Sequence, residues 1–221
     1  MDFDYIIVGG GSAGCVLANR LSADSKSRVC LLEAGGEDRN LWIHIPVGYV
    51  KTMSNPALNW LFKTKPHEST DNRTISVPRG KVLGGSSAIN SMLYVRGQAR
   101  DYDTWAQLGC SGWSYSDVLP YFKRAENREQ GADAYHGVGG PINVDVPREC
   151  YPVLDQVIEA GGALGYPTHH DYNGKSQAGF SYYQVTQKNG WRWSTKKGYI
   201  DPVRSRRKNL RVETRAFVKK V

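Results

Sequence analysis

Three glycines near the start of the chain have the spacing of a turn that binds phosphate groups. Gly9, Gly11 and Gly14 follow the apolar run 5–8 and precede apolar residues at helical spacing, so we predict a strand, a tight turn and a helix. The first glycine permits the turn, the second lets the backbone approach a pyrophosphate, and the third lets helix and strand pack closely. Such glycines alone also serve ordinary turns, but in this setting they predict dinucleotide binding.

Residues on either side of this turn are expected to complete the site. Ser12 and Ala13 lie at the predicted start of the helix, where unpaired N–H groups and the helix dipole favour an anion. Glu33 ends the next apolar run and is followed by Ala34 and Gly35. A carboxylate there can accept hydrogen bonds from ribose hydroxyls and disfavours a 2′-phosphate. FAD and NAD share the ADP half, so this turn leaves both open.

A second glycine-rich segment, "RGKVLGGSSAIN", has residues that can approach a cofactor closely. Gly84 and Gly85 remove the steric barrier to close approach, and Ser86 and Asn90 can donate and accept hydrogen bonds without bulk. A flexible Gly-Ser linker is the alternative, but linkers do not usually run straight into an apolar stretch such as "AINSMLYV". We therefore interpret this segment as a second cofactor-binding loop.

This second segment resembles the first signature of the glucose-methanol-choline (GMC) oxidoreductases. The stretches "DYIIVGGGSAGCVLANRLS", "LLEAGG", "YHGVGGP" and "GWRWSTKKGYI" extend the likeness along almost the whole chain. It is strongest to the branch of bacterial choline and alcohol dehydrogenases. The resemblance implies a flavoprotein that binds FAD, with the Val82 backbone and the side chains of Ser86 and Asn90 near the flavin. It also implies that the backbone of Val218 contacts the adenine.

The same resemblance implies an oxidoreductase that acts on CH–OH groups of choline or another alcohol. In that family, a base removes the hydroxyl proton and a hydride passes to flavin N5. The family's catalytic histidine lies in a C-terminal part to which no position of this chain corresponds, so no catalytic residue is assigned. We expect an N-terminal fragment that is inactive by itself. Some members attach FAD through a histidine that precedes the loop asparagine; Ile89 stands there, so we expect non-covalent FAD.

Other functions stay open at this point. Some members of the family retain the flavin and cleave hydroxynitriles, and nothing in these residues separates a lyase from a dehydrogenase. A non-catalytic FAD-binding module that needs a partner chain is a further alternative, whereas an NAD-only dehydrogenase would not need the segment 80–90. The partners we expect are a small-molecule alcohol and an electron acceptor, either a quinone or oxygen, which the sequence does not distinguish.

The expected fold class is α/β, with an incomplete Rossmann-type FAD-binding domain, an irregular excursion that covers the flavin and the start of a substrate domain. We assign four segments. They are the Rossmann part (1–45), the FAD lid and flavin-contacting extension (46–150), the start of the substrate domain (151–190) and a truncated return to the FAD-binding domain (191–221). Elsewhere we predict two short helices in 101–128, the second capped by Ser114 or Ser116, a helix ending at 161–165, and strands at 180–186 and 209–221.

Charge, cysteines and histidines limit the function classes further. The net charge of +8 is concentrated in residues 186–221, with 12 Lys and Arg against 2 acidic residues, which favours a solvated basic face over nucleic-acid binding. The four cysteines have no metal-ligand spacing, and no signal peptide or membrane-spanning run is apparent. We expect a cytoplasmic protein, with peripheral association at the inner membrane left open. We expect no metal site: His169 and His170 are assigned to the surface and His136 to a turn.

Overall fold

The computed structural model of the protein describes residues 2–169 and 171–221. The chain divides into two compact units, one formed by residues 1–91 and 191–221 and the other by residues 92–190. These boundaries split the predicted segment 46–150 at residue 91. The roles of lid and substrate domain that we assigned to the predicted segments stay predictions.

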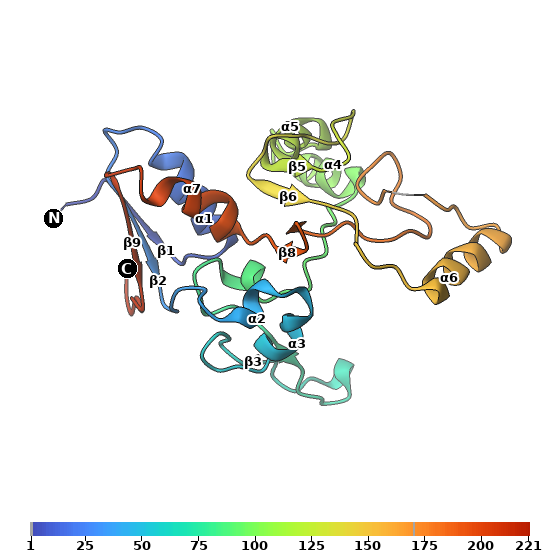
Figure 1. Cartoon of the computed structure of the whole chain (residues 1–221), viewed down its shortest axis with the longest axis horizontal. Coiled ribbons are helices and arrows are strands. Elements are labelled where there is room, and N and C mark those ends of the chain that lie inside the picture. The colour runs from blue at the N-terminus through green and yellow to red at the C-terminus, as the bar shows by residue number, and fades with distance from the viewer. Residues whose placement is uncertain (1, 170) are drawn as a thin grey trace. The chain divides into compact units, whose positions relative to one another are not determined.

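The first unit is built on a parallel sheet of three strands in the order β1 (Tyr5–Val8), β2 (Val29–Glu33) and β9 (Leu210–Thr214), shown in Figure 1. Helix α1 (Ser12–Leu21) connects β1 to β2 and packs against both strands. Alternation along β1 follows from the two-residue period of a strand: Ile7 is buried, whereas Ile6 and Val8 are exposed. The predicted strand, turn, helix and second strand are confirmed, as is the α/β class.

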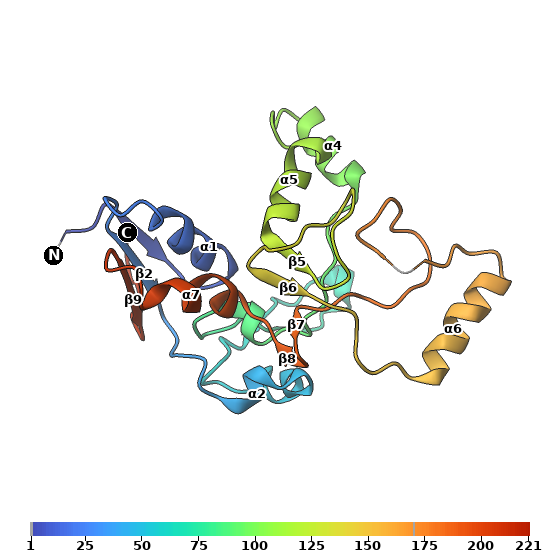
Figure 2. The same ribbon diagram turned by 45° about the horizontal axis from the view of Figure 1, so that its top comes forward.

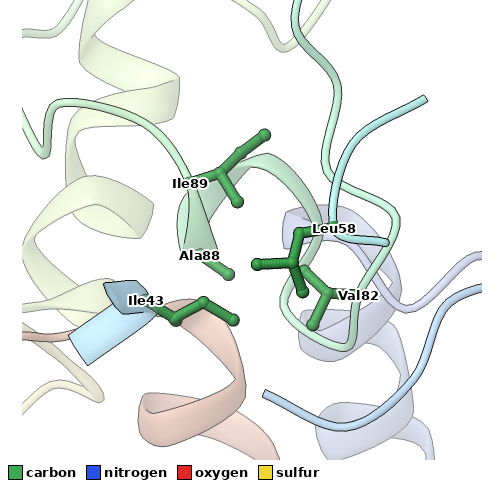
Figure 3. Close-up of a cluster of buried hydrophobic side chains, with 5 residues drawn as sticks. All are labelled: Ile43, Leu58, Val82, Ala88 and Ile89. Atoms are coloured by element: carbon green, nitrogen blue, oxygen red, sulfur yellow. The ribbon is translucent and has the colours of Figure 1, made fainter. Parts of the chain in front are cut away.

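The other elements of the first unit are short. They are α2 (Leu41–His44), η1 (Pro46–Gly48), α3 (Tyr49–Thr52), β3 (Phe62–Lys63), η2 (Glu68–Thr70), β4 (Ser76–Val77), η3 (Gly85–Ala88), β8 (Trp191–Arg192), a π-helical turn η4 (Lys196–Ile200) and α7 (Asp201–Arg204). Figure 3 shows the apolar cluster that joins several of these segments: Ile43, Leu58, Val82, Ala88 and Ile89. Through this cluster, the second glycine loop packs against Ile43 of α2 and against Leu58, which precedes the loop in the chain.

The second unit contains two packed helices, α4 (Ala99–Gln107) and α5 (Tyr115–Ala125), side by side in Figure 2. Ser114 caps α5, because its hydroxyl accepts from the N–H of Asp117 while that carboxylate accepts from the N–H of Ser114. The remaining elements are the parallel pair β5 (Glu126–Arg128) and β6 (Ile142–Val144), helix α6 (Pro152–Ala163) and β7 (Gln187–Lys188). The predicted helices in 101–128 and before 161–165 are confirmed.

Two strand predictions need correction. Residues 180–186 form no strand, and Val185 makes only single bridges to Leu93 and Asp145. Aromatic and β-branched residues favour strands only where a partner backbone runs alongside. The predicted strand 209–221 ends at Thr214, because Arg215 takes the left-handed conformation with φ of 60°. Among the described residues, no helix is long and apolar enough to cross a membrane.

Candidate functional site

The first glycine turn has the geometry that its spacing predicts. Gly9 has φ of 99°, a conformation that strongly favours glycine, and its N–H donates to the carbonyl of Leu32 at 2.8 Å. A side chain at Gly14 would place its Cβ 1.8 Å from the Gly9 carbonyl oxygen, so helix α1 can meet the turn only if residue 14 is glycine. Within the described part of the chain, no side chain caps the start of α1, and N–H groups at a helix start favour an anion.

The carboxylate of Glu33 binds the backbone of the first glycine turn and the backbone of Gly35. Its Oε2 accepts from the N–H of Gly10 at 2.7 Å, its Oε1 accepts from the N–H of Gly35 at 2.8 Å, and the residue is buried. An ionised carboxylate has about four acceptor positions, so these two bonds leave capacity for further donors such as ribose hydroxyls. The sequence indicated a ligand for the carboxylate but not this structural role.

The second glycine loop lies directly against the first turn. The N–H of Gly84 donates to the carbonyl of Gly10 at 2.7 Å, and a Cβ on Gly85 would lie 2.6 Å from the Cα of Gly11. Both loop glycines have positive φ, 99° and 55°. Ser86 accepts a hydrogen bond from the N–H of Gly80 through its hydroxyl at 3.1 Å. The loop is therefore rigid and closely packed, and it is not a flexible linker.

A cavity of about 460 Å³ opens where these segments meet. Eight predicted site residues line it: Gly9, Gly11, Ser12, Glu33, Ala34, Gly85, Ser86 and Val218. Six others do not line it: Ala13, Gly14, Gly35, Val82, Gly84 and Asn90. Of these, Gly14 and Gly35 are needed for close backbone packing and Val82 belongs to the apolar cluster. The structure therefore brings most of the predicted site together around one hollow.

Several lining residues were not predicted from the sequence. Trp60 stacks on Phe62 with ring centroids 5.8 Å apart and lies 6.0 Å from Phe217; all three line the cavity, together with Arg79. In the sequence, only the irregular excursion expected to cover the flavin pointed to the region of Trp60. A cavity with glycine turns and a helix start on one side, and with an arginine and flat aromatic rings, suits a dinucleotide that has phosphates and planar bases. The residues present therefore fit FAD.

The second unit holds a chain of buried charges. Arg96 donates from Nη2 to Oε2 of Glu126 at 2.9 Å, and His136 places Nδ1 3.0 Å from both oxygens of the same carboxylate. Nε2 of His136 lies 2.7 Å from Oδ2 of Asp171. Burial lowers the pKa of His136, but the hydrogen bonds with Asp171 and Glu126 outweigh it and raise that pKa to about 9. His136 is therefore an imidazolium at neutral pH.

Sequence reasoning missed this network, because its members are far apart in the chain. Asp133, His136 and Asp171 have ligand atoms within 4.8 Å of one another, as a metal site would require. The 2.7 Å approach of the imidazole to Asp171 is that of a hydrogen-bonded ion pair. His169 was assigned to the surface, but it is half-buried: Nδ1 accepts from the N–H of Asp171 and Nε2 is enclosed. His170 lies outside the described residues.

Known proteins resemble the chain over its whole length. It is 46% identical to the oxygen-dependent choline dehydrogenase of Photobacterium profundum, with 99% of this chain and 39% of that protein covered. It is 44% identical to an alcohol dehydrogenase [acceptor] of Pseudomonas putida, with 99% and 40% covered. The chain thus spans about two fifths of the length of these relatives.

A solved structure and a family profile agree with these relatives. An FAD-dependent oxidoreductase from Chaetomium thermophilum superimposes with a TM-score of 0.85 at 30% identity, over 96% of this chain and 38% of that one. The profile of the GMC oxidoreductases matches residues 3–221. Together with the two glycine segments around one cavity, this match shows that the chain belongs to the GMC oxidoreductase family.

Proposed function

We propose that this chain binds FAD, without a covalent link, in the cavity between the two glycine segments. Gly11, Ser12 and Gly85 would hold the pyrophosphate, because they line the cavity and no described side chain forms a capping hydrogen bond at the start of α1. Glu33 would accept from ribose hydroxyls, and the backbone near Val218 would meet the adenine. The observation that carries this proposal is the cavity itself, which gathers residues from both ends of the chain.

The absence of a histidine at position 89 supports a dissociable cofactor. Ile89 is 2% exposed and packs in the apolar cluster with Ile43, Leu58, Val82 and Ala88. An aliphatic side chain has no nucleophilic atom with which to form a bond to a flavin. Acid denaturation of the FAD-loaded protein should therefore release all the yellow flavin into the supernatant. Flavin that stayed with the precipitated polypeptide would show that another residue forms a link.

We further propose that the protein oxidises an alcohol, with choline as the first substrate to test. Bound FAD supplies the hydride acceptor. The residues described above would bind and orient it, and the rings of Trp60, Phe62 and Phe217 offer apolar surface to its planar groups. The names of the two relatives support an alcohol as the substrate, and they support oxygen or another compound as the electron acceptor. Among residues 2–169 and 171–221, no histidine lines the cavity. Because the family resemblance places the catalytic histidine in a part to which no position here corresponds, we expect these 221 residues to bind FAD without oxidising the alcohol.

The test begins with a titration of the purified 221-residue chain with FAD, followed by flavin fluorescence and the visible spectrum. Saturable binding with a shifted spectrum is expected. The loaded chain is then mixed with choline and an electron-accepting dye, and separately with choline under an oxygen electrode. Absence of FAD binding would overturn the cofactor assignment. Dye reduction or oxygen uptake by this chain would overturn the expectation that the base for the hydroxyl proton lies elsewhere.

A further inference from the structure

The second unit contains two asparagines that are each followed by glycine, Asn173–Gly174 and Asn189–Gly190. In such a pair the backbone nitrogen of the glycine can attack Cγ of the asparagine side chain, because glycine has no Cβ to hinder the approach. The attack closes a five-membered succinimide ring and releases ammonia. Local sequence gives both pairs the same reactivity, so the fold has to distinguish them.

The side chain of Asn173 is held by hydrogen bonds to both of its amide atoms. Oδ1 accepts from the N–H of Arg96 at 2.7 Å. Nδ2 donates to the carbonyl of Tyr94 and to Oε1 of Gln184, both at 2.9 Å. Asn173 is 4% exposed, and its own N–H donates to Oδ1 of Asp171 at 2.8 Å. Its Cγ can therefore meet the next nitrogen in the chain only after several buried hydrogen bonds have broken.

Asn189 lacks these restraints. It is exposed, and within residues 2–169 and 171–221 its side chain has no hydrogen-bond partner. The N–H of Gly190, which would be the attacking group, also has no acceptor in the described part of the chain. A Cβ on Gly190 would meet nothing closer than the side chain of Arg148, at 3.9 Å. Both reacting groups are thus unbonded, and the space around them is open.

The backbone at Asn189 also favours a change of conformation. Its φ of 52° lies in the left-handed region, which residues other than glycine populate sparsely. Ring closure requires rotation about the Cα–C bond of Asn189, and no side-chain contact opposes that rotation. Strand β7, directly before the turn, is only two residues long, so few backbone bonds resist local opening. The turn can reach the reactive geometry without unfolding of the unit.

We propose that Asn189 is a site of spontaneous deamidation and that the same fold protects Asn173. The nitrogen of Gly190 loses its proton to hydroxide and bonds to Cγ of Asn189, while the bond from Cγ to Nδ2 breaks and ammonia leaves. Water then opens the ring at one of its two carbonyls, which gives aspartate or isoaspartate. Either product adds a carboxylate, and isoaspartate also lengthens the backbone by one carbon atom. The reaction needs water alone and does not depend on FAD.

The test compares both sites in one sample of the purified 221-residue chain, kept at mildly alkaline pH in buffer and in concentrated urea. Trypsin cleavage at Lys175 and Lys188 places the two asparagines on different peptides, whose conversion is followed by mass spectrometry. In urea both sites should react at similar rates. In buffer, Asn189 should react within about tenfold of its rate in urea, and Asn173 should be slowed at least about a hundredfold. Equal rates at the two sites in buffer, or equal protection of both, would overturn the proposal.

The products test the mechanism. Opening of a succinimide yields both aspartate and isoaspartate, and reversed-phase chromatography separates peptides that contain them. Both forms should therefore appear at position 189. Aspartate alone would indicate direct hydrolysis of the side-chain amide by water, and attack by the nitrogen of Gly190 would then be wrong.

A variant and an internal control test the need for this pair of residues. Asn189→Gln would have to close a six-membered ring, so the release of ammonia from the native chain should fall at least about tenfold. Asn72 is the control, because it is also exposed with φ of 52° and has no side-chain partner among the described residues, but Arg73 follows it. Asn72 should stay intact. Unchanged ammonia release in the variant, or reaction of Asn72 as fast as Asn189, would overturn the proposal.

Discussion

Gly11 and Gly14 belong to one sequence pattern, but they have different physical roles. A Cβ at Gly14 would lie 1.8 Å from the carbonyl oxygen of Gly9, whereas a Cβ at Gly11 would meet nothing closer than the Cα of Gly85 at 3.9 Å. Gly11 lines the cavity and Gly14 does not. Close packing of helix and strand therefore requires glycine at position 14, and access of a ligand to the backbone requires it at position 11.

We expect Gly11→Ala to weaken FAD binding at least tenfold without a change in melting temperature, because the added methyl group enters the cavity but not the protein core. Gly14→Ala should instead destabilise the unit by about 3 kcal/mol, since backbone must move to remove the overlap. Thermal melts and FAD titrations of both variants check these outcomes.

Gly36→Ala is the control for the first variant. A Cβ at Gly36 would also find its nearest neighbour at 3.9 Å, the Nε of Arg215, and Gly36 lies outside the cavity. It should bind FAD as the wild type does. Equal losses in Gly11→Ala and Gly36→Ala would mean that the cavity is not where the cofactor binds.

At the scale of elements, the second unit depends on polar contacts to order its core. Glu126, the first residue of β5, and His136 are both fully buried, and Arg96 and Asn173 are nearly so. Asn173 accepts from the N–H of Arg96 at 2.7 Å and donates to the carbonyl of Tyr94 at 2.9 Å. The network thus connects β5 to the segments that carry Arg96, His136 and Asp171. The protonation state of His136 should therefore affect the stability of the unit.

The stability of the second unit should fall as the pH rises through about 9. His136 has a folded-state pKa of about 9, above its unfolded value of 6.5, so its contribution is fully present below pH 6.5 and is lost as the proton leaves the folded state. The loss is on the order of 3 kcal/mol. Urea unfolding monitored between pH 7 and pH 10 measures it.

His136→Gln is the matched variant for this pH dependence, since glutamine does not titrate. Tyrosines and cysteines also titrate near pH 9, so the informative quantity is the difference between the wild type and His136→Gln. The variant should be less stable than the wild type at pH 7, and the difference should shrink by pH 10. A difference that stays constant with pH would show that His136 does not change protonation in this range.

At the scale of the whole molecule, the described sheet has an apolar edge. β1 lies at one end of the three-stranded sheet, and Ile6 on it is 62% exposed. An exposed strand edge with apolar side chains favours association with other chains. Ile6→Lys should therefore reduce the concentration-dependent light scattering of the 221-residue chain, without a change in its melting temperature.

Val50→Lys is the corresponding control, because Val50 is 58% exposed in the same unit but lies on helix α3. It adds the same charge without altering a strand edge. If both variants reduce scattering equally, net charge and not the edge of β1 controls association.

Local pattern was sufficient wherever neighbours in sequence determine the structure. Apolar runs, glycine spacing and capping residues predicted β1, α1, β2 and the paired helices α4 and α5, because these elements depend on contacts within a few residues. The strand predicted at 180–186 was wrong, since strand formation needs a partner that local sequence does not specify. Trp60 and Phe217 line the same cavity although they are far apart in the sequence. The spacing of apolar residues along the chain does not predict such a contact.

The sequence by itself determined that this chain carries two glycine segments suited to a dinucleotide, because such segments consist of consecutive residues with fixed spacing. Only the tertiary structure decided which residues face the cavity and which support it. It placed Asn90 against Arg192, 102 positions away, and it buried His136 between Glu126 and Asp171. The reason is physical: burial and hydrogen-bond partners depend on which segments pack together, and packing is a property of the whole fold.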